Sequence, residues 1–170
     1  MSDEEFRQIA MQHLDMVFNL ARRMTFTREE AEDLVQETYL RALQGWRRKR
    51  PERMAPWLAT ICLNAGRSFH RRRSAGVTEV LDPDAGRENL SPHNTEGDAL
   101  ASIDRDIVHD ALRRLSEEQR EAVALMDLCG FTASQVAEML DVSRNTVLAR
   151  VHRGHKRLAL LLEEARRREA

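Results

Sequence analysis

The stretch TASQVAEMLDVSRNTVLARVHRGHKRL, residues 132–158, decides the fold of the second half of this 170-residue chain. It opens with a capping box, in which Thr132 is followed three positions later by Gln135, so a short helix over residues 132–140 is predicted. The next three residues, DVS, form a tight turn whose serine can cap a second helix over residues 143–165. Two helices joined by such a turn have the geometry of a helix-turn-helix, whose second helix enters the major groove of DNA.

The second helix of this pair has one apolar face and one polar, cationic face. At about 100° per residue, the buried stripe consists of Val147, Val151, Leu158, Leu161 and Leu162. The opposite face and its flanks carry the residues expected to contact DNA, namely Arg144, Asn145, Thr146, Ala149, Arg150, His152, Arg153 and Lys156. Asparagine can bond adenine edges, a small alanine allows close approach, and cations can bond bases or phosphates. A solvated basic helix end is the alternative, but the macrodipole disfavours cations as early in a helix as Arg144.

Charge is strongly segregated along a chain whose net charge is only −1. Residues 44–76 carry nine Lys and Arg against one acidic residue, and residues 143–162 carry five against none. Between these two basic blocks, residues 77–110 carry nine Asp and Glu against two Arg. A polyanion such as DNA would therefore meet two local basic surfaces although the total charge is near zero.

Helical periodicity dominates the rest of the chain, and the alternation typical of strands is almost absent. Capping boxes begin helices at Thr27 and Ser116. Further apolar stripes predict helices over residues 4–24, 55–73 and 102–114. The expected fold class is therefore all-α.

Residues 74–101 separate two groups of predicted helices. This segment places prolines and glycines among Asp, Glu, Asn and Ser and has no sustained period, which indicates a flexible acidic linker. We therefore expect two small helical domains, one over residues 1–73 and one over residues 102–170.

Catalysis and metal binding are not indicated by any motif. The six histidines and two cysteines lack metal-ligand spacings such as CxxC or HExxH, and there is no nucleophile elbow or glycine-rich phosphate loop. We expect no catalytic residue, no metal and no cofactor. Cys62 and Cys129 stand among apolar neighbours, which favours buried reduced thiols over a disulfide or redox pair.

Membrane and export signals are also missing from the sequence. The acidic N-terminus MSDEEFRQ is unlike a signal peptide, and no apolar run approaches the roughly 20 residues that cross a bilayer. The expectation is a cytoplasmic protein without membrane insertion.

Three segments, in this order and at this spacing, resemble a known family. LSEEQREAVALMDLCGFTASQVAEMLDVSRNTVLARVHRGHKRL (residues 115–158) is similar to region 4 of bacterial sigma factors of the extracytoplasmic-function (ECF) class, in the sigma-70 family. AEDLVQETYLRAL (residues 31–43) resembles region 2.2, and PWLATICLNAGRSFHRRR (residues 56–73) resembles the end of region 2. The resemblance implies a protein that binds core RNA polymerase through its β′ and β subunits, recognises −35 and −10 promoter DNA, and assists strand opening.

By this resemblance, the helix over residues 31–43 docks on a coiled coil of the polymerase β′ subunit. The matching positions in this chain are Asp33, Gln36, Glu37, Leu40 and Arg41. They lie on the face opposite the apolar stripe of this helix, where they are free for a partner. A solvated acidic helix is the alternative, because a lone exposed leucine is common on protein surfaces.

The first basic block would, by the same resemblance, read the −10 element and capture a base extruded from the non-template strand. Strand opening requires cations for the separated backbones and a pocket or stacking surface for the flipped base. The candidates are Trp46, Arg47, Arg48, Lys49, Asn64, Arg67, Ser68 and Arg71. Trp57 is the less suitable aromatic, because it begins a predicted buried stripe.

Four positions depart from the family pattern. Ser68 replaces a usual aspartate, Asn145 occupies a position that is commonly glycine, and Leu148-Ala149 replaces a usual basic-serine pair. We expect these departures to alter promoter preference and not the assignment to the class.

Rival interpretations explain less of the sequence. A stand-alone helix-turn-helix regulator would leave AEDLVQE and the first basic block unexplained. A sigma-like decoy that sequesters an anti-sigma factor would not need cations in both basic blocks. An anti-sigma partner is implied by the resemblance, although no residue identifies it. We also expect the isolated chain to bind duplex DNA weakly, because its acidic segments can cover the basic faces.

Overall fold

The computed structural model describes residues 2–76 and 96–169, which are helical without any strand, in agreement with the all-α prediction. Most of the predicted linker, residues 77–95, lies outside the described residues. The helical elements are α1 (Asp3–Ala10), the 3₁₀ turn η1 (Met11–His13), α2 (Leu14–Met24), α3 (Arg28–Arg48), α4 (Met54–Gly76), α5 (Glu96–Arg113), α6 (Glu117–Val123), the π-helical turn η2 (Ala124–Leu128), α7 (Ala133–Leu140) and α8 (Arg144–Glu169).

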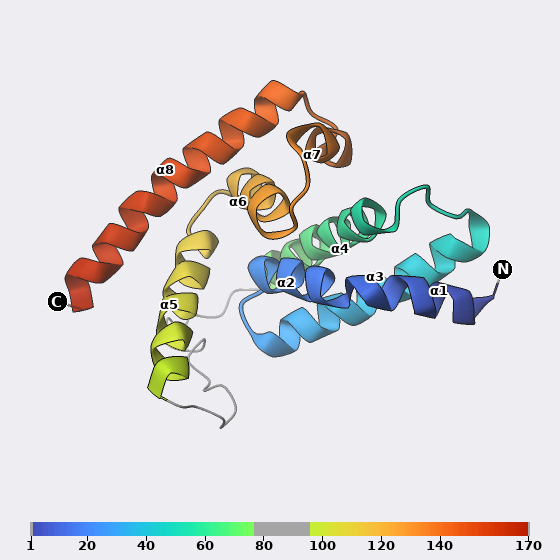
Figure 1. The fold of residues 1–170 in the computed structure, drawn as a ribbon, viewed down its shortest axis with the longest axis horizontal. Helices are drawn as coiled ribbons and strands as arrows, with labels where there is room; N and C mark the ends of the chain where they lie inside the picture. The colour runs from blue at the N-terminus through green and yellow to red at the C-terminus, as the bar shows by residue number, and fades with distance from the viewer. Residues whose placement is uncertain (1, 77–95, 170) are drawn as a thin grey trace.

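The first group of helices packs α2, α3 and α4 against one another, with α1 lying along α3 (Figure 1). The capping box predicted at Thr27 is present, because the Thr27 hydroxyl accepts from the Glu30 amide and the Glu30 carboxylate accepts from the Thr27 amide. The predicted stripe of α3 is buried, including Leu34 and Thr38. This packing fixes which face of α3 and of α4 remains on the surface.

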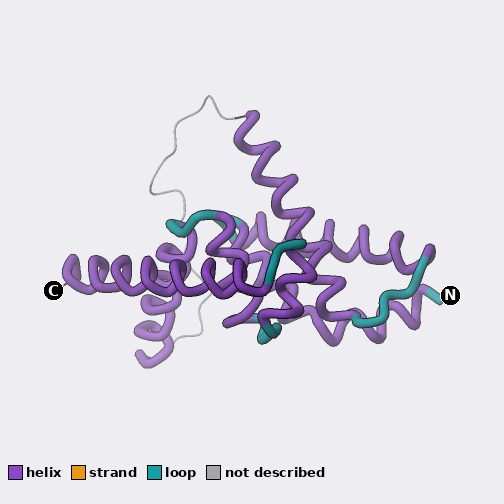
Figure 2. Tube along the Cα trace, turned by 90° about the horizontal axis from the view of Figure 1, so that it is seen from above, coloured by secondary structure: helices purple, strands orange, loops and turns teal. Residues whose placement is uncertain are grey.

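The second group places α6 and α7 against the first half of the long helix α8, while α5 packs along its second half (Figure 1). Val136 of α7 and Val147 of α8 are fully buried between these helices. Beyond them, α8 runs out to the end of the chain, at the opposite end of the molecule from the N-terminus (Figure 2).

Helix boundaries differ from the predictions at four places, one of which is the end of α8 at Glu169 instead of residue 165. The helix predicted over residues 4–24 is interrupted by η1, where the Ala10 carbonyl accepts a hydrogen bond of 2.9 Å from the Tyr39 hydroxyl. Helix α4 extends past the predicted end to Gly76. Helix α5 begins at Glu96, so the last residues assigned to the linker are helical.

The two groups of helices share one continuous hydrophobic core. Helix α2 contacts both η2 and α5, and α4 contacts α7. As a result, Val17 and Leu20 of the first group belong to the same buried cluster as Leu125 and Val136 of the second group. The interface between the halves is therefore partly apolar, and it brings α4 and α6 face to face.

Helix α8 lies close to α6 at Gly154. A Cβ atom added at Gly154 would lie 2.7 Å from Cγ2 of Val123. Valine has a short, stiff side chain that cannot swing away, so only a residue without a side chain fits at this crossing.

Substitution at this crossing is expected to destabilise the second group of helices. We predict that Gly154→Val lowers the free energy of unfolding by about 2 kcal/mol, because overpacking a close contact costs roughly 1–3 kcal/mol. Ala159→Val, at an exposed position of the same helix, is the matched control and should change stability by less than about 0.5 kcal/mol. Urea unfolding followed by circular dichroism measures both; equal stabilities of the two variants would contradict this account of the crossing.

Candidate nucleic-acid interface

The helix-turn-helix predicted for residues 132–158 is present as α7, a three-residue turn and α8. Thr132 and Gln135 form the capping box at the start of α7. Asp141 ends that helix with a left-handed backbone at φ 54°, and the Ser143 hydroxyl caps α8 by accepting from the Thr146 amide at 3.1 Å. An aspartate tolerates this conformation better than most residues, which allows so short a turn.

The outward face of α8 carries most of the residues predicted to contact DNA. Val147 and Val151 are buried, as predicted, and they fix the rotation of the helix about its axis. The side chains left exposed on the other side are Arg144, Asn145, His152, Arg153 and Lys156, with Thr146 and Ala149 partly exposed beside them. This surface combines an amide, small residues and cations, which is the combination that base edges and phosphates require.

Arg150 is held apart from this outward face. Its side chain is 17% exposed and lies 3.5 Å from the Glu118 carboxylate on α6. The arginine is thus occupied by a carboxylate of its own domain and braces α8 against α6.

Helix α4 presents a second polar face. Asn64 and Arg71 are exposed on it, and Ser68 lies between them with its hydroxyl donating to the Asn64 carbonyl at 3.1 Å. The Arg71 guanidinium is 3.4 Å from the same hydroxyl. These three predicted −10 residues therefore form one connected surface.

Arg67, the fourth predicted residue on this face, is bound to the other half of the protein. Its Nε and Nη2 atoms donate to the two carboxylate oxygens of Glu121 on α6, at 2.8 and 2.6 Å. Glu121 is 3% exposed, and Glu117 adds a longer contact of 3.9 Å. The bond to Glu121 raises the pKa of Arg67, so the guanidinium stays charged. We call this contact the interdomain ion pair.

A hollow of about 890 Å³ surrounds the interdomain ion pair. One wall is the polar face of α4, and the opposite wall is acidic, formed by Glu117, Glu118 and Glu121 of α6. The carboxylates of α6 thus occupy the side of α4 on which a phosphate backbone was predicted to lie. Glu121 was not identified from the sequence; it follows SEEQR in an acidic helix start, and nothing local indicates that it is buried.

The basic block at the end of α3 is arranged differently from the prediction. Trp46 is 3% exposed and packs on Phe6 with ring centroids 5.8 Å apart. This corrects the expectation that Trp46 offers a stacking surface to a flipped base, because the ring is enclosed by the core. The same block is partly neutralised by α1, since Arg47 is bonded to Asp3 and Arg50 to Glu5.

Two cations at the end of α3 are exposed and lie outside the ion pairs with α1. Arg48 and Lys49 are exposed at the end of α3. They are the members of the block that the described arrangement leaves available for a phosphate backbone.

The predicted core-binding residues form a ridge along α3. Asp33, Gln36 and Leu40 are exposed, with Leu40 at 58%, and the Arg41 guanidinium bonds the Glu37 carboxylate at 2.6 Å. The ridge thus presents an apolar side chain within a charged surface, which suits a protein interface.

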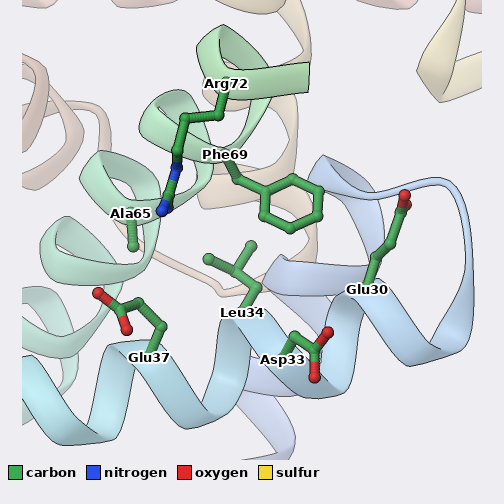
Figure 3. Close-up of a pocket in the computed structure, with 7 residues that line it drawn as sticks. All are labelled: Glu30, Asp33, Leu34, Glu37, Ala65, Phe69 and Arg72. Atoms are coloured by element: carbon green, nitrogen blue, oxygen red, sulfur yellow. The ribbon is translucent and has the colours of Figure 1, made fainter. Parts of the chain in front are cut away.

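A groove lies beside this ridge, between α3 and α4. Its volume is about 510 Å³. Figure 3 shows Asp33 and Glu37 on one side and Arg72 on the other, with Phe69 and Leu34 between them. The ridge and groove together form a continuous surface on the first group of helices.

Both cysteines are free thiols; Cys62 is buried, as predicted, whereas Cys129 is partly exposed. Burial raises the pKa of Cys62 to about 12 and that of Cys129 to about 11, so both resist forming the reactive thiolate. Among the described residues there is no group of three His, Cys, Asp or Glu side chains that could hold a metal ion. No helix within the described ranges is long and apolar enough to span a bilayer.

Two family descriptions match this sequence. Residues 9–76 match Sigma-70 region 2, and residues 105–158 match Sigma-70, region 4. The ECF RNA polymerase sigma factor SigL of Mycobacterium tuberculosis is 32% identical over 162 residues, which cover 93% of this chain and 89% of SigL. The ECF RNA polymerase sigma factor SigE of Mycolicibacterium smegmatis is 32% identical over 154 residues, covering 89% of this chain but only 59% of SigE.

Two solved structures have the same fold over nearly all of this chain. The sigma factor RpoE from Bartonella quintana, crystallised with the anti-sigma factor NepR, superposes with a TM-score of 0.76 at 28% identity, over 94% of this chain and 98% of RpoE. CnrH, in complex with the cytosolic domain of CnrY, gives a TM-score of 0.71 at 22% identity, over 96% of this chain and 90% of CnrH. At that identity the second likeness shows the fold alone.

Loss of the interdomain ion pair is expected to loosen the contact between the two halves. We predict that Glu121→Gln shifts the equilibrium toward separated halves by roughly tenfold, or about 1.4 kcal/mol, a moderate effect because Arg67 stays partly solvated. Small-angle X-ray scattering measures the change as an increase in the radius of gyration. Glu32→Gln removes an exposed ion pair within α3 and should leave the scattering profile unchanged; an unchanged profile for Glu121→Gln as well would show that the pair does not hold the halves together.

Proposed function

This chain belongs to the extracytoplasmic-function class of the sigma-70 family, and from that membership we propose that it binds core RNA polymerase and directs promoter-specific initiation of transcription. The observation that carries the proposal is the second helix of the helix-turn-helix, α8. This helix holds Asn145, Arg153 and Lys156 outward on a buried apolar support. Proteins of this family are transcription regulators, so the site is a binding surface and not a catalytic centre. We propose a cytoplasmic location, where polymerase acts.

Recognition of the −35 element is proposed for the outward face of α8. Asn145 can pair with an adenine edge, and Arg153 and Lys156 can reach bases or phosphates on the same side of the helix. Arg144 lies nearer the start of the helix, where phosphate contact is favoured. Arg150 is better suited to bracing α8, because Glu118 already binds it.

Recognition of the −10 element is proposed for the polar face of α4. Asn64, Ser68 and Arg71 supply donors and acceptors for an unpaired strand, and Arg67 joins them once it leaves Glu121. Arg48 and Lys49 at the end of α3 supply further cations for the separated backbones. Strand opening needs such cations because the two phosphate backbones repel each other.

Binding to core polymerase is proposed for the ridge of α3 formed by Asp33, Gln36, Glu37, Leu40 and Arg41. The two groups of helices are packed together through the interdomain ion pair, which we call the closed arrangement. In this arrangement the ridge stays on the surface while Arg67 is bound by Glu121. We propose that the chain first docks on polymerase through the ridge, and that the two halves then separate and expose the face of α4 to DNA. Weak DNA binding by the isolated chain follows from this order.

An anti-sigma factor is also proposed as a partner. The structural relative RpoE was crystallised with the anti-sigma factor NepR. Because that relative superposes over nearly all of this chain, a partner of the same kind can engage similar surfaces here.

Run-off transcription on a genomic promoter library tests the proposal directly. Core polymerase with this chain should give transcripts that start at discrete sites, and core polymerase alone should not. If the chain co-migrates with core polymerase and yet no discrete start appears, the proposed function fails.

Two substitutions on the outward face of α8 should weaken −35 recognition. We predict that Asn145→Ala and Arg153→Ala each reduce run-off transcription from a −35-dependent promoter roughly tenfold, since a base contact contributes about 1–3 kcal/mol. Arg166→Ala removes an exposed cation farther along the same helix and should have no effect. A pull-down should show that all three variants bind core polymerase normally; equal loss of core binding would point to misfolding.

Charge reversal on the ridge of α3 should act on polymerase and not on DNA. We predict that Glu37→Arg weakens binding to core polymerase roughly tenfold, because it replaces an acidic contact by a basic one and disrupts the pair with Arg41. Fluorescence anisotropy with labelled chain measures the affinity. Glu163→Arg, a reversal on the exposed side of α8, serves as the control. Unchanged core affinity of Glu37→Arg would remove the ridge from the proposal.

A further inference from the structure

The corner where α2 meets α5 and α6 contains one buried histidine. His109 of α5 is 7% exposed, and its Nδ1 lies 3.3 Å from Nη1 of Arg23 on α2. A guanidinium can only donate a hydrogen bond, so Nδ1 must accept it. The imidazole is therefore neutral in the closed arrangement and carries its proton on Nε2.

Hydrogen-bond acceptors are scarce at this corner. Within the described part of the chain, the buried nitrogens without a hydrogen-bond partner include Arg22 Nη1, Arg23 Nε, His109 Nε2 and Arg120 Nε. Burial also lowers the pKa of each of these three arginines. Because unpartnered buried donors oppose the arrangement that buries them, the corner tolerates little additional positive charge.

Positive charge faces His109 from every helix that forms the corner. The arginines that act on it are Arg22 and Arg23 of α2, Arg113 of α5 and Arg120 of α6.

The nearby carboxylates act on these arginines instead: Asp106 and Glu30 on Arg22, Glu117 and Glu121 on Arg120, and Asp110 on Arg113. From α8, which also packs on α5, Glu164 pairs with Arg114. From α4, His70 meets the edge of the Phe26 ring, and that ring carries the Arg113 guanidinium on its face.

We propose that His109 is an acid-sensitive latch, whose protonation drives apart the two groups of helices. A proton on Nδ1 would point at the Arg23 guanidinium and set one donor against another. It would also add a fifth positive charge to four arginines in a partly desolvated corner. Separation of the halves relieves both effects, because water then solvates the imidazolium and the arginines.

The direction of the pH dependence follows from the pKa of His109. Burial, followed by the four arginines, lowers this pKa to about 3, from 6.5 for an exposed histidine. A group whose pKa is depressed in the closed state stabilises closure above the open-state value and loses that contribution as the pH falls toward the closed-state value. For one such proton, the ratio of open to closed molecules rises about tenfold between about pH 7.5 and pH 5.5.

Separation of the two groups of helices on protonation of His109 does not depend on what the separated protein binds. Its consequence for promoter recognition, the release of Arg67 from Glu121, rests on the proposed function. An experiment that measures only the separation of the halves therefore tests the latch whether or not the chain directs transcription.

Single-molecule energy transfer on the full chain provides that experiment. Dyes placed through Gln44→Cys on α3 and Ala159→Cys on α8 report the separation, and both positions are exposed. The native thiols of Cys62 and Cys129, with pKa values of about 12 and 11, react poorly with maleimide dyes. The measurement is made in the wild-type background and with Glu121→Gln, which raises the open fraction into a measurable range.

The expected result is a rise of about tenfold in the open-to-closed ratio from pH 7.5 to pH 5.5. His109→Gln keeps an acceptor for Arg23 but cannot be protonated, so it should abolish the rise. His70→Gln, at the other histidine of the corner, should preserve it. A ratio independent of pH, or a rise that survives in His109→Gln, would overturn the proposal.

Proton NMR of the wild-type chain gives a second measurement, independent of whether His109→Gln folds. The His109 ring should remain neutral while the molecule is closed. An observed titration near pH 6.5 without opening would also overturn the latch.

Discussion

The bidentate contact between Arg67 and Glu121 is the interaction on which the behaviour of this chain depends. A phosphate placed at Arg67 would lie beside the Glu121 carboxylate, which already accepts from Nε and Nη2 of the guanidinium, and the two anions would repel each other. Because Glu121 is buried, the carboxylate stays fixed opposite α4 for as long as the halves are packed together. The closed arrangement and full use of the α4 surface by DNA therefore exclude each other.

The ridge of α3 is not subject to this exclusion. Leu40 and Gln36 are exposed in the closed arrangement, and the ion pair between Glu37 and Arg41 is formed within α3 itself. A surface that is complete before the halves separate can bind first. Binding energy gained there can then be used to separate the halves, provided that polymerase binds the open arrangement more tightly than the closed one.

Local features of the sequence predicted most of the fold. The capping boxes at Thr27 and Thr132 and the buried stripe of α8 depend on neighbours within one helical turn, so the sequence alone reveals them. Trp46 was also within reach of this reasoning, because it lies four residues after Ala42 and continues the buried stripe of α3. Its position beside four basic residues indicates a charged surface, whereas the helical period indicates burial.

Contacts between the halves were beyond such reasoning. Glu121 and His109 have polar side chains on helices that could equally face solvent, and their burial is decided by α4 and α2, more than 50 and 80 residues away in the sequence. The predicted face of α4 was placed correctly on the surface of its own bundle. Which carboxylates lie opposite that face is a property of how two bundles pack, and no periodicity within either bundle encodes it.

Salt should affect unequally the two partners that compete for the cationic face of α4, which are the Glu121 carboxylate and DNA. DNA binding releases the counterions condensed on the phosphates, so its affinity falls steeply as the salt concentration rises. Formation of the pair between Arg67 and Glu121 releases no condensed counterions. The Glu121 carboxylate is also shielded from mobile ions, because it is buried. Higher salt therefore favours the closed chain over the DNA-bound one. A partner that binds through the partly apolar ridge around Leu40 loses less affinity than DNA under the same conditions, so in the proposed order of binding higher salt weakens the DNA step more than the docking step.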